Sequence, residues 1–335
     1  MRLRDKSRDS DTPLLKVRGL TTYFFTDAGV VHAIDEISFD VMKGEILGLV
    51  GETGCGKSMT ALSVMKLIPF PGKIVKGNIF YKGEDLSFKS KKEMSRIRGN
   101  DLAMIFQDPS SSLNPSHKIG DQVAEPIKIH TKISRKLARE KAVEIMGKVG
   151  LPDPEELRRR YPHELSGGMK QRIMIATAIS CGPDLLIADE PTTALDVTIQ
   201  AQILHLIKLL KEDLGSSIIL ITHDFGVVAE MCDRVAVMYA GKIVEVADVM
   251  TIFNKPLHPY TKGLLKALPT GNRSQGNLQT IEGIVPNLIN PDPGCRFRPR
   301  CNKAMKKCIE DPPTINAGGG QSVACFLYED SGVEK

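Results

Sequence analysis

The sequence lacks any apolar run long enough to cross a membrane and any segment typical of a secretion signal. Its longest apolar stretches, such as ILGLVG and SIILIT, have the length of single β-strands, whereas a spanning helix needs roughly 18 to 20 apolar residues. The opening residues, MRLRDKSRDSD, mix both charge signs and contain no apolar core of a signal peptide. We therefore expect a cytoplasmic protein, in which disulfides are disfavoured and the seven cysteines are free thiols or ligands of a metal or cluster.

The sequence also lacks a strong excess of charge, internal repeats and low-complexity tracts. Its net charge of +5 over 335 residues is mild and does not by itself require a nucleic-acid partner. Apolar residues make up 41% of the chain and charged residues 25%, which is ordinary for a globular protein with a substantial core.

Short apolar runs alternate with helical patterns, which predicts an α/β fold with a mostly parallel sheet. A helix is expected to begin after Ser134 and to end at Gly150, and another is expected after Ser166. From about residue 250, scattered prolines predict an irregular extension without a long periodic core of its own. The clearest buried strands are predicted at Ile46–Val50, Leu185–Ala188 and Ile218–Ile221.

Residues 51–58, GETGCGKS, follow a predicted strand and precede a predicted helix, as a phosphate-binding P-loop does. Backbone N–H groups at Gly51, Gly54 and Gly56 can curl around phosphate oxygens at the helix N-terminus. Lys57 would reach the β and γ phosphates of ATP, and the Ser58 hydroxyl would bind Mg²⁺.

Two further motifs agree with a nucleotide site. The stretch LLIADE places Asp189 and Glu190 at the carboxyl end of a buried strand, where one carboxylate can hold Mg²⁺ through water and the other can act as general base. The stretch LSGGMKQR places Ser166 and two glycines at a helix start, which is a second anion site. Because the chain has one P-loop, this second site is expected to serve the nucleotide of a partner in a dimer.

Together GETGCGKS, LSGGMKQR and LLIADEPTTALD resemble the ATPase subunit of an ABC transporter. The resemblance covers roughly residues 14–250, after an N-terminal tail at 1–13 and before an extension at 251–335. It implies a P-loop fold with a RecA-like core, an antiparallel β subdomain and a helical subdomain at about 110–180 that carries the signature motif.

The resemblance also implies roles for single residues. Gln107 matches the glutamine that senses Mg²⁺, and His223 matches a switch histidine that contacts the γ-phosphate. Phe24, rather than its neighbour Tyr23, best matches the aromatic residue that stacks on adenine. The implied catalytic residues are Lys57, Glu190 and His223, and the implied Mg²⁺ ligands are Ser58, Gln107 and Asp189. The remaining residues implied in nucleotide binding or in the dimer interface around it are Glu52, Thr53, Cys55, Met59, Ser166, Gly167, Gly168 and Asp196.

Cys55 departs from the family pattern, which commonly has a small residue such as serine there. A thiol at a helix N-terminus is expected to have a lowered pKa and to react with alkylating reagents. The alternative is that cysteine is simply a small residue that fits.

Two segments narrow the resemblance to importers of dipeptides and oligopeptides, a subfamily that also includes nickel and glutathione systems. They are DPSSSLNPSHKIGDQVAEPI after Gln107 and LHPYTKGLL at the start of the extension. The implied partners are two integral membrane permease subunits, a second ATPase subunit (identical or paralogous) and, indirectly, an extracytoplasmic binding protein. The chain would then lie at the cytoplasmic face of the membrane. Non-transport ABC ATPases that act on nucleic acid or ribosomes are the competing class, but the chain lacks a long coiled-coil insertion and a second ATPase domain.

Four cysteines, Cys295, Cys301, Cys308 and Cys325, lie in the proline-rich extension with five, six and sixteen residues between them. Such spacing lacks the close pairs of most structural zinc sites and favours a [4Fe–4S] cluster, with zinc as the alternative and unligated thiols as the third reading. The pattern also resembles the cysteine-bearing tail of peptide-importer ATPases. Six arginines and lysines between Cys295 and Cys308 are expected to favour the thiolate forms. They also fit a nucleic-acid patch, but Phe297 is the one aromatic residue among them, so no nucleic-acid partner is expected.

Overall fold

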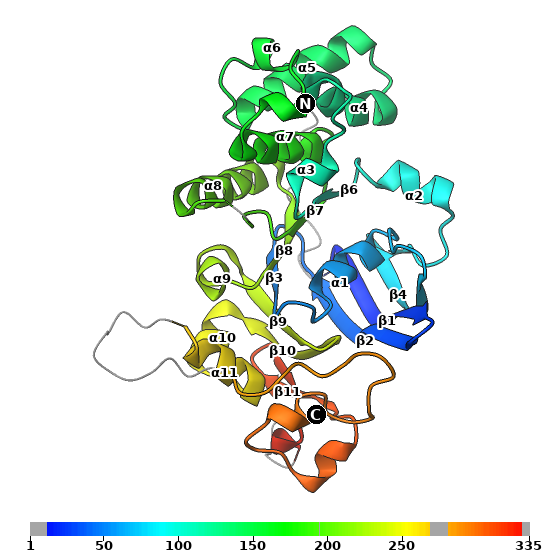
Figure 1. Cartoon of the computed structure of the whole chain (residues 1–335), viewed down its shortest axis with the longest axis vertical. Coiled ribbons are helices and arrows are strands. Elements are labelled where there is room, and N and C mark those ends of the chain that lie inside the picture. Colours follow the sequence, from blue (N-terminus) through cyan, green and yellow to red (C-terminus); the bar gives the residue numbers. More distant parts are fainter. Residues whose placement is uncertain (1–11, 194, 269–280, 330–335) are drawn as a thin grey trace, which may run out of the picture.

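The computed structural model describes residues 12–193, 195–268 and 281–329, so most of the predicted tail at 1–13 lies outside the described residues. The chain contains two β-sheets, and Figure 1 shows the strands β3, β8 and β7 of the larger sheet in the middle of the view with the four-stranded sheet to their right. One sheet has four strands in the order β2-β1-β4-β5, and the other has eight in the order β11-β12-β10-β9-β3-β8-β7-β6.

The four-stranded sheet is antiparallel throughout. Its long strands alternate buried and half-exposed residues, and their buried side chains share one apolar core with the larger sheet. Helix α1, Lys57–Val64, contributes to that core and so ties the start of the P-loop helix to both sheets. The strands are β1 Leu15–Thr26, β2 Gly29–Val41, β4 Gly72–Tyr81 and β5 Glu84–Asp85.

The eight-stranded sheet has a parallel centre, and the three strands predicted from apolar runs are confirmed in it. They are fully buried, as expected for a parallel sheet covered on both faces. The parallel strands are β6 Leu102–Ile105, β7 Leu185–Asp189, β8 Ser217–Thr222, β3 Ile46–Val50 and β9 Arg234–Tyr239, and β10 Lys242–Asp248 pairs antiparallel with β9.

A group of helices between β6 and β7 forms the upper part of Figure 1. Both predicted starts are confirmed, because the Ser134 side chain caps α5 and the Ser166 side chain caps α7. Gly150, which follows the end of α5, has a φ of 73°. The elements between β5 and β7 include α2 Lys91–Ile97, α3 Pro109–Ser112, α4 Ile119–His130, α5 Arg135–Lys148, α6 Pro154–Leu157, the 3₁₀ turn Pro162–Glu164 and α7 Gly167–Ile179.

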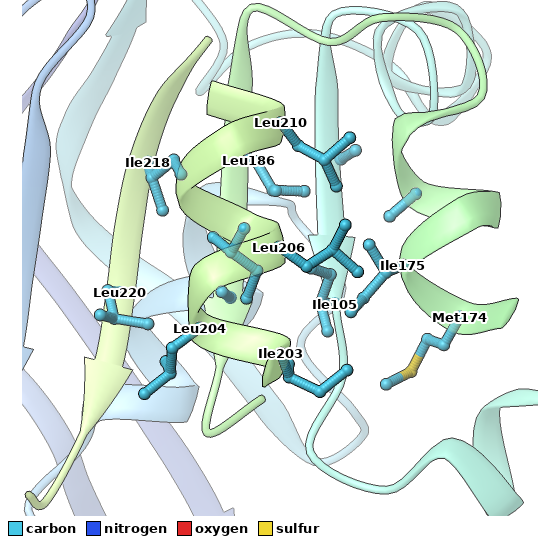
Figure 2. Close-up of a cluster of buried hydrophobic side chains, with 14 of the residues drawn as sticks. Ile105, Met174, Ile175, Leu186, Ile203, Leu204, Leu206, Leu210, Ile218 and Leu220 are labelled. Carbon is cyan, nitrogen blue, oxygen red and sulfur yellow. The ribbon is translucent and has the colours of Figure 1, made fainter. Parts of the chain in front are cut away.

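Two helices follow β7 and β8 and pack beside the parallel strands. Helix α8, Val197–Leu214, turns a buried stripe toward the sheet, and helix α9, Phe225–Met231, packs near β3 and β8. Figure 2 shows Leu206 and Leu210 of α8 in one cluster with Leu186 of β7 and Ile175 of α7. This packing anchors β7 and α8, which lie on either side of the loop after β7.

The C-terminal extension is more closely joined to the core than the sequence predicts. Its hairpin of β11, Thr314–Gly318, and β12, Gln321–Ala324, adds to the edge of the large sheet because β12 pairs with β10. The rest is short turns, in agreement with the predicted irregularity. The other elements are α10 Val249–Asn254, α11 Pro259–Lys266 and the 3₁₀ turns Arg298–Arg300, Lys306–Ile309 and Phe326–Tyr328.

Within the described ranges, the search for membrane spans finds no helix with the length and apolar character that crossing a bilayer requires.

Candidate nucleotide-binding site

The predicted P-loop connects β3 to α1. Two of its glycines are required by close backbone contacts. A Cβ atom on Gly51 would lie 2.1 Å from the Met238 carbonyl oxygen, and one on Gly56, whose φ is 106°, would lie 2.6 Å from the Ala33 carbonyl oxygen. The loop therefore keeps a narrow curve that only glycine permits, with Thr53 and Gly54 exposed at its outer side.

Lys57 lies at the inside of this loop. Its side chain is buried, and its Nζ donates hydrogen bonds to the carbonyl oxygens of Gly51 at 2.8 Å and Glu52 at 3.0 Å. The ammonium group is thus held where the loop curves, with Ser58 and half-buried Met59 next along α1.

The lowered pKa predicted for Cys55 is wrong. The residue is only 1% exposed, and burial raises the pKa of its thiol despite the nearby Lys57 ammonium. Desolvation of a thiolate outweighs the helix N-terminus here, so Cys55 is a small buried residue that fits its place.

Ser58 and Asp189 meet across the gap between α1 and the end of β7. The Ser58 hydroxyl donates a hydrogen bond of 3.0 Å to Oδ1 of Asp189. Burial raises the pKa of Asp189 to about 6, the neighbouring Glu190 carboxylate adds to the rise, and the bond from Ser58 and the Lys57 charge oppose it. A buried acid whose charge is so poorly compensated is well suited to a cation.

Glu190 stands at a sharp bend directly after β7, with a φ of 44°, and its N–H donates to the Ile221 carbonyl oxygen of β8. Its Oε2 accepts hydrogen bonds of 2.9 Å from Gln107 Nε2 and from the Thr193 hydroxyl. On the other side, Nδ1 of His223 lies 3.3 Å from Oε1. Side chains from the ends of three neighbouring strands thus gather on one carboxylate.

Two residues of this arrangement were not predicted from the sequence. Thr193, in PTTALD, orients the Glu190 carboxylate through its hydroxyl. The sequence signal for this contact is that Thr193 follows Glu190 by three residues. Gln171, in LSGGMKQR, is buried and donates to the Pro191 carbonyl oxygen at 2.6 Å, which fixes the loop after Glu190.

The signature residues lie apart from the chain's own P-loop. Ser166 and Gly167 are exposed at the start of α7, and Gly168 is half-buried next to them. Figure 1 shows α7 among the upper helices and α1 lower down, beside the four-stranded sheet. Asp196 is likewise exposed, and its side chain caps α8 by accepting the Ile199 N–H.

Phe24 and Tyr23 have different surroundings on β1. Tyr23 stacks on His32 at a centroid distance of 3.9 Å, and its hydroxyl donates to Asp35 at 2.9 Å. Phe24 is half-buried, and its ring lies against Gly72 of β4. Tyr23 is therefore already engaged, and Phe24 is the more available of the two rings.

The four cysteines of the extension lie near one another. Burial raises the pKa of Cys295 to about 11, with smaller contributions from the charges of the other three sulfur atoms. Within the described residues, however, no group of three or more His, Cys, Asp or Glu side chains is arranged to hold a metal ion.

The prediction that nearby cations favour the thiolates is wrong. The pKa values of Cys295, Cys301 and Cys325 are all raised, chiefly by burial. The arginines beside the cysteines turn instead to carboxylates elsewhere, since Arg296 binds Asp35 and Arg300 binds Glu52.

A strand, a glycine loop and a lysine-bearing helix, with two acids at the end of another strand of the same sheet, define a P-loop ATPase with a separate helical subdomain. Family models agree: residues 34–193 match "ABC transporter", and residues 244–308 match "Oligopeptide/dipeptide transporter, C-terminal region". The solved dimer of the ATP-binding cassette MJ0796 has the same fold, with a TM-score of 0.64, 24% identity, and coverage of 70% of this chain and 98% of that one.

Curated relatives match almost from end to end. The chain is 50% identical to the oligopeptide transport ATP-binding protein AppD of Bacillus subtilis, over 96% of this chain and 99% of that one. It is 44% identical to the dipeptide transport ATP-binding protein DppD of Escherichia coli, over 95% and 98% of the two chains. The chain therefore belongs to the family of ATP-binding proteins of oligopeptide and dipeptide ABC transporters.

Proposed function

We propose that this chain hydrolyses ATP to power the import of dipeptides or oligopeptides through a membrane ABC transporter. The observation that carries the proposal is the gathering of Gln107, Thr193 and His223 around the Glu190 carboxylate, next to a P-loop. The relatives named above as peptide transport proteins supply the class of cargo.

ATP would bind along the P-loop, with the Lys57 ammonium exchanging its carbonyl partners for phosphate oxygens. The Ser58 hydroxyl and the Asp189 carboxylate fit a magnesium ion, because they already face each other and the acid lacks full compensation. Gln107, next to Glu190, is the third proposed ligand. When bound, Mg²⁺ would neutralise charge on the phosphates.

Glu190 would act as general base. Its carboxylate takes a proton from water while the water oxygen bonds to the γ-phosphorus and the bond to the ADP oxygen breaks. Thr193 and Gln107 hold one oxygen of the carboxylate, which leaves the other to face His223 and the incoming water. His223 would contact the γ-phosphate, and Phe24 would stack on adenine.

The exposed signature residues support a two-chain site. Ser166, Gly167 and Gly168 form the start of α7, a helix that Figure 1 shows apart from α1, so they would bind the nucleotide held by a second ATPase subunit. Asp196 would cross the same interface. Binding of two ATP molecules would close the dimer, and hydrolysis would open it.

Family membership implies membrane permease subunits and an extracytoplasmic binding protein as partners, and we place the chain at the cytoplasmic face of the membrane. The test is purification with the permease subunits, followed by ATPase assays in the presence of the binding protein and a set of peptides. Peptide-stimulated hydrolysis is expected. Stimulation by nickel or glutathione alone would contradict the peptide cargo.

We further propose that the extension, residues 251–335, holds a [4Fe–4S] cluster on Cys295, Cys301, Cys308 and Cys325. Two of the sulfur atoms accept backbone hydrogen bonds of the kind that stabilise cluster thiolates: the Lys303 N–H donates to Cys301 and the Met305 N–H donates to Cys308, each at 3.4 Å. The raised pKa values of Cys295, Cys301 and Cys325 are consistent with thiols that stay protonated without a metal and release their protons when they bind one. The cluster would staple a segment that otherwise consists of short turns.

Anaerobic purification followed by iron, sulfide and zinc analysis tests this assignment. We expect a brown protein with about four irons per chain, as the [4Fe–4S] composition requires. Colourless protein with one zinc per chain would show that the four cysteines bind zinc and hold no iron–sulfur cluster. Metal-free protein would show that the thiols are unligated.

A further inference from the structure

An arginine of the cysteine-bearing extension reaches the P-loop. Arg300, directly before Cys301, donates from Nη1 to Oε2 of Glu52 at 2.7 Å and from Nη2 to Oε1 at 3.1 Å. Glu52 is the second residue of GETGCGKS, so 248 positions of sequence separate the partners. This is a two-point contact between a planar guanidinium and a carboxylate, the geometry that lysine cannot reproduce.

The arginine is fixed on every side. Its side chain is 5% exposed, Nε donates to the Glu282 carbonyl oxygen at 3.0 Å, and Nη2 also donates to the Ile281 carbonyl oxygen at 3.1 Å. Its head lies over the Tyr239 ring, 5.8 Å from the centroid. The hydrogen bonds to Glu52 raise the pKa of Arg300, so it stays charged.

A second contact holds the same loop residue through its backbone. The Glu52 N–H donates to the hydroxyl of Tyr260 at 2.9 Å, and Tyr260 is fully buried in α11. Its ring packs with Tyr239 and with Phe297 of the cysteine-bearing segment. Both the carboxylate and the N–H of Glu52 are thus held by the extension.

We propose that Arg300 is a positioning residue for ATP binding, which neutralises and fixes Glu52 so that the P-loop can accept a polyanion. Without Arg300, an unpaired carboxylate lies one residue from the glycine that opens the loop and repels the incoming triphosphate. The partners of the general base Glu190, which are Gln107, Thr193 and His223, belong to other segments of the chain, so the chemical step is expected to change little. The proposal requires no metal at the cysteines, but it rests on the proposed nucleotide site.

The test is a double-mutant cycle in the full chain: wild type, Arg300→Ala, Glu52→Gln and the combination. ATP affinity is measured with a fluorescent ATP analogue, and KM and kcat are measured by phosphate release. We expect Arg300→Ala to weaken ATP binding about tenfold, the scale of a charge-assisted bidentate pair, with kcat within about twofold. In the Glu52→Gln background the same change should matter less than about threefold, because no carboxylate is left to neutralise.

Arg298→Ala is the matched control, since this neighbouring arginine has no ion-pair partner in the described part of the chain, and it should bind ATP as wild type does. Equal losses of affinity in the wild-type and Glu52→Gln backgrounds, or a fall in kcat at unchanged KM, would overturn the proposal. If Arg300→Ala does not fold, Arg300→Gln enters the same cycle under the same criteria. Wild-type protein that fails to bind the analogue would instead refute the proposed function.

Discussion

Replacing Glu190 with glutamine should remove hydrolysis while leaving the fold and ATP binding intact. The side chain is 12% exposed, and its partners allow an amide of the same shape. The glutamine oxygen can take the place of Oε2 and accept from Gln107 and Thr193, while its NH₂ group faces the His223 ring nitrogen. No buried donor is therefore left without an acceptor, and the stability cost should be small.

The catalytic loss has a different size. A positioned general base contributes about 10² to 10⁴ in rate, which corresponds to about 3–5 kcal/mol in the barrier. We therefore expect the kcat of Glu190→Gln to fall by about 10² to 10⁴, with the ATP dissociation constant within about twofold of wild type. Phosphate release gives kcat, analogue binding gives affinity, and size-exclusion chromatography with ATP should show a persistent dimer.

Thr193→Val is the matched comparison for Glu190→Gln, because it removes one hydrogen bond to the Glu190 carboxylate and keeps the general base. Its kcat should fall only about three- to tenfold, which corresponds to about 0.7–1.4 kcal/mol, the usual net contribution of one hydrogen bond. Hydrolysis by Glu190→Gln at more than about a tenth of the wild-type rate would refute the assignment of Glu190 as base, since a general base contributes far more.

Three further predictions concern stability and accessibility. Burial lowers the pKa of His258 from 6.5 to about 3. The neutral buried imidazole therefore stabilises the fold fully above pH 6.5, and this stabilisation is lost as the pH falls. Urea unfolding should show that wild type loses about 2 kcal/mol of unfolding free energy between pH 7 and pH 5, and that His258→Asn does not. Gly51→Ala should lower the unfolding free energy by about 1–3 kcal/mol and weaken ATP binding, because its Cβ would clash with the Met238 carbonyl oxygen, and unchanged values by urea unfolding and analogue binding would contradict the contact. Cys55 should resist maleimide in native protein and react after denaturation, as peptide mass spectrometry can show. Rapid labelling of the native protein would show that Cys55 is a reactive thiol.

Local signals predicted the phosphate-binding half of the site. The P-loop needs only adjacent residues, namely a buried strand, glycines and a helix start, and the serine caps of α5 and α7 follow from the same short-range rules. The acids at the end of β7 are predictable because a buried parallel strand has a continuous apolar run that ends at them.

Burial and long-range pairing could not be predicted in this way. The pKa of Cys55 depends on what covers it, and the sequence shows only the helix start. The strands β11 and β12 are short and carry few apolar residues, so their addition to the large sheet leaves no clear pattern. Arg300 was grouped with other basic residues because nothing local shows that its partner is Glu52.

The measurement that tests the central claim most directly is peptide uptake by the reconstituted transporter. The chain would be assembled in liposomes with its permease subunits, second ATPase subunit and binding protein, and uptake of a labelled dipeptide would be followed with ATP in the compartment that this chain faces. We predict uptake that depends on hydrolysable ATP and is lost when Glu190→Gln replaces the wild-type chain. Equal uptake by the two assemblies, or ATP hydrolysis that never responds to peptide, would contradict it.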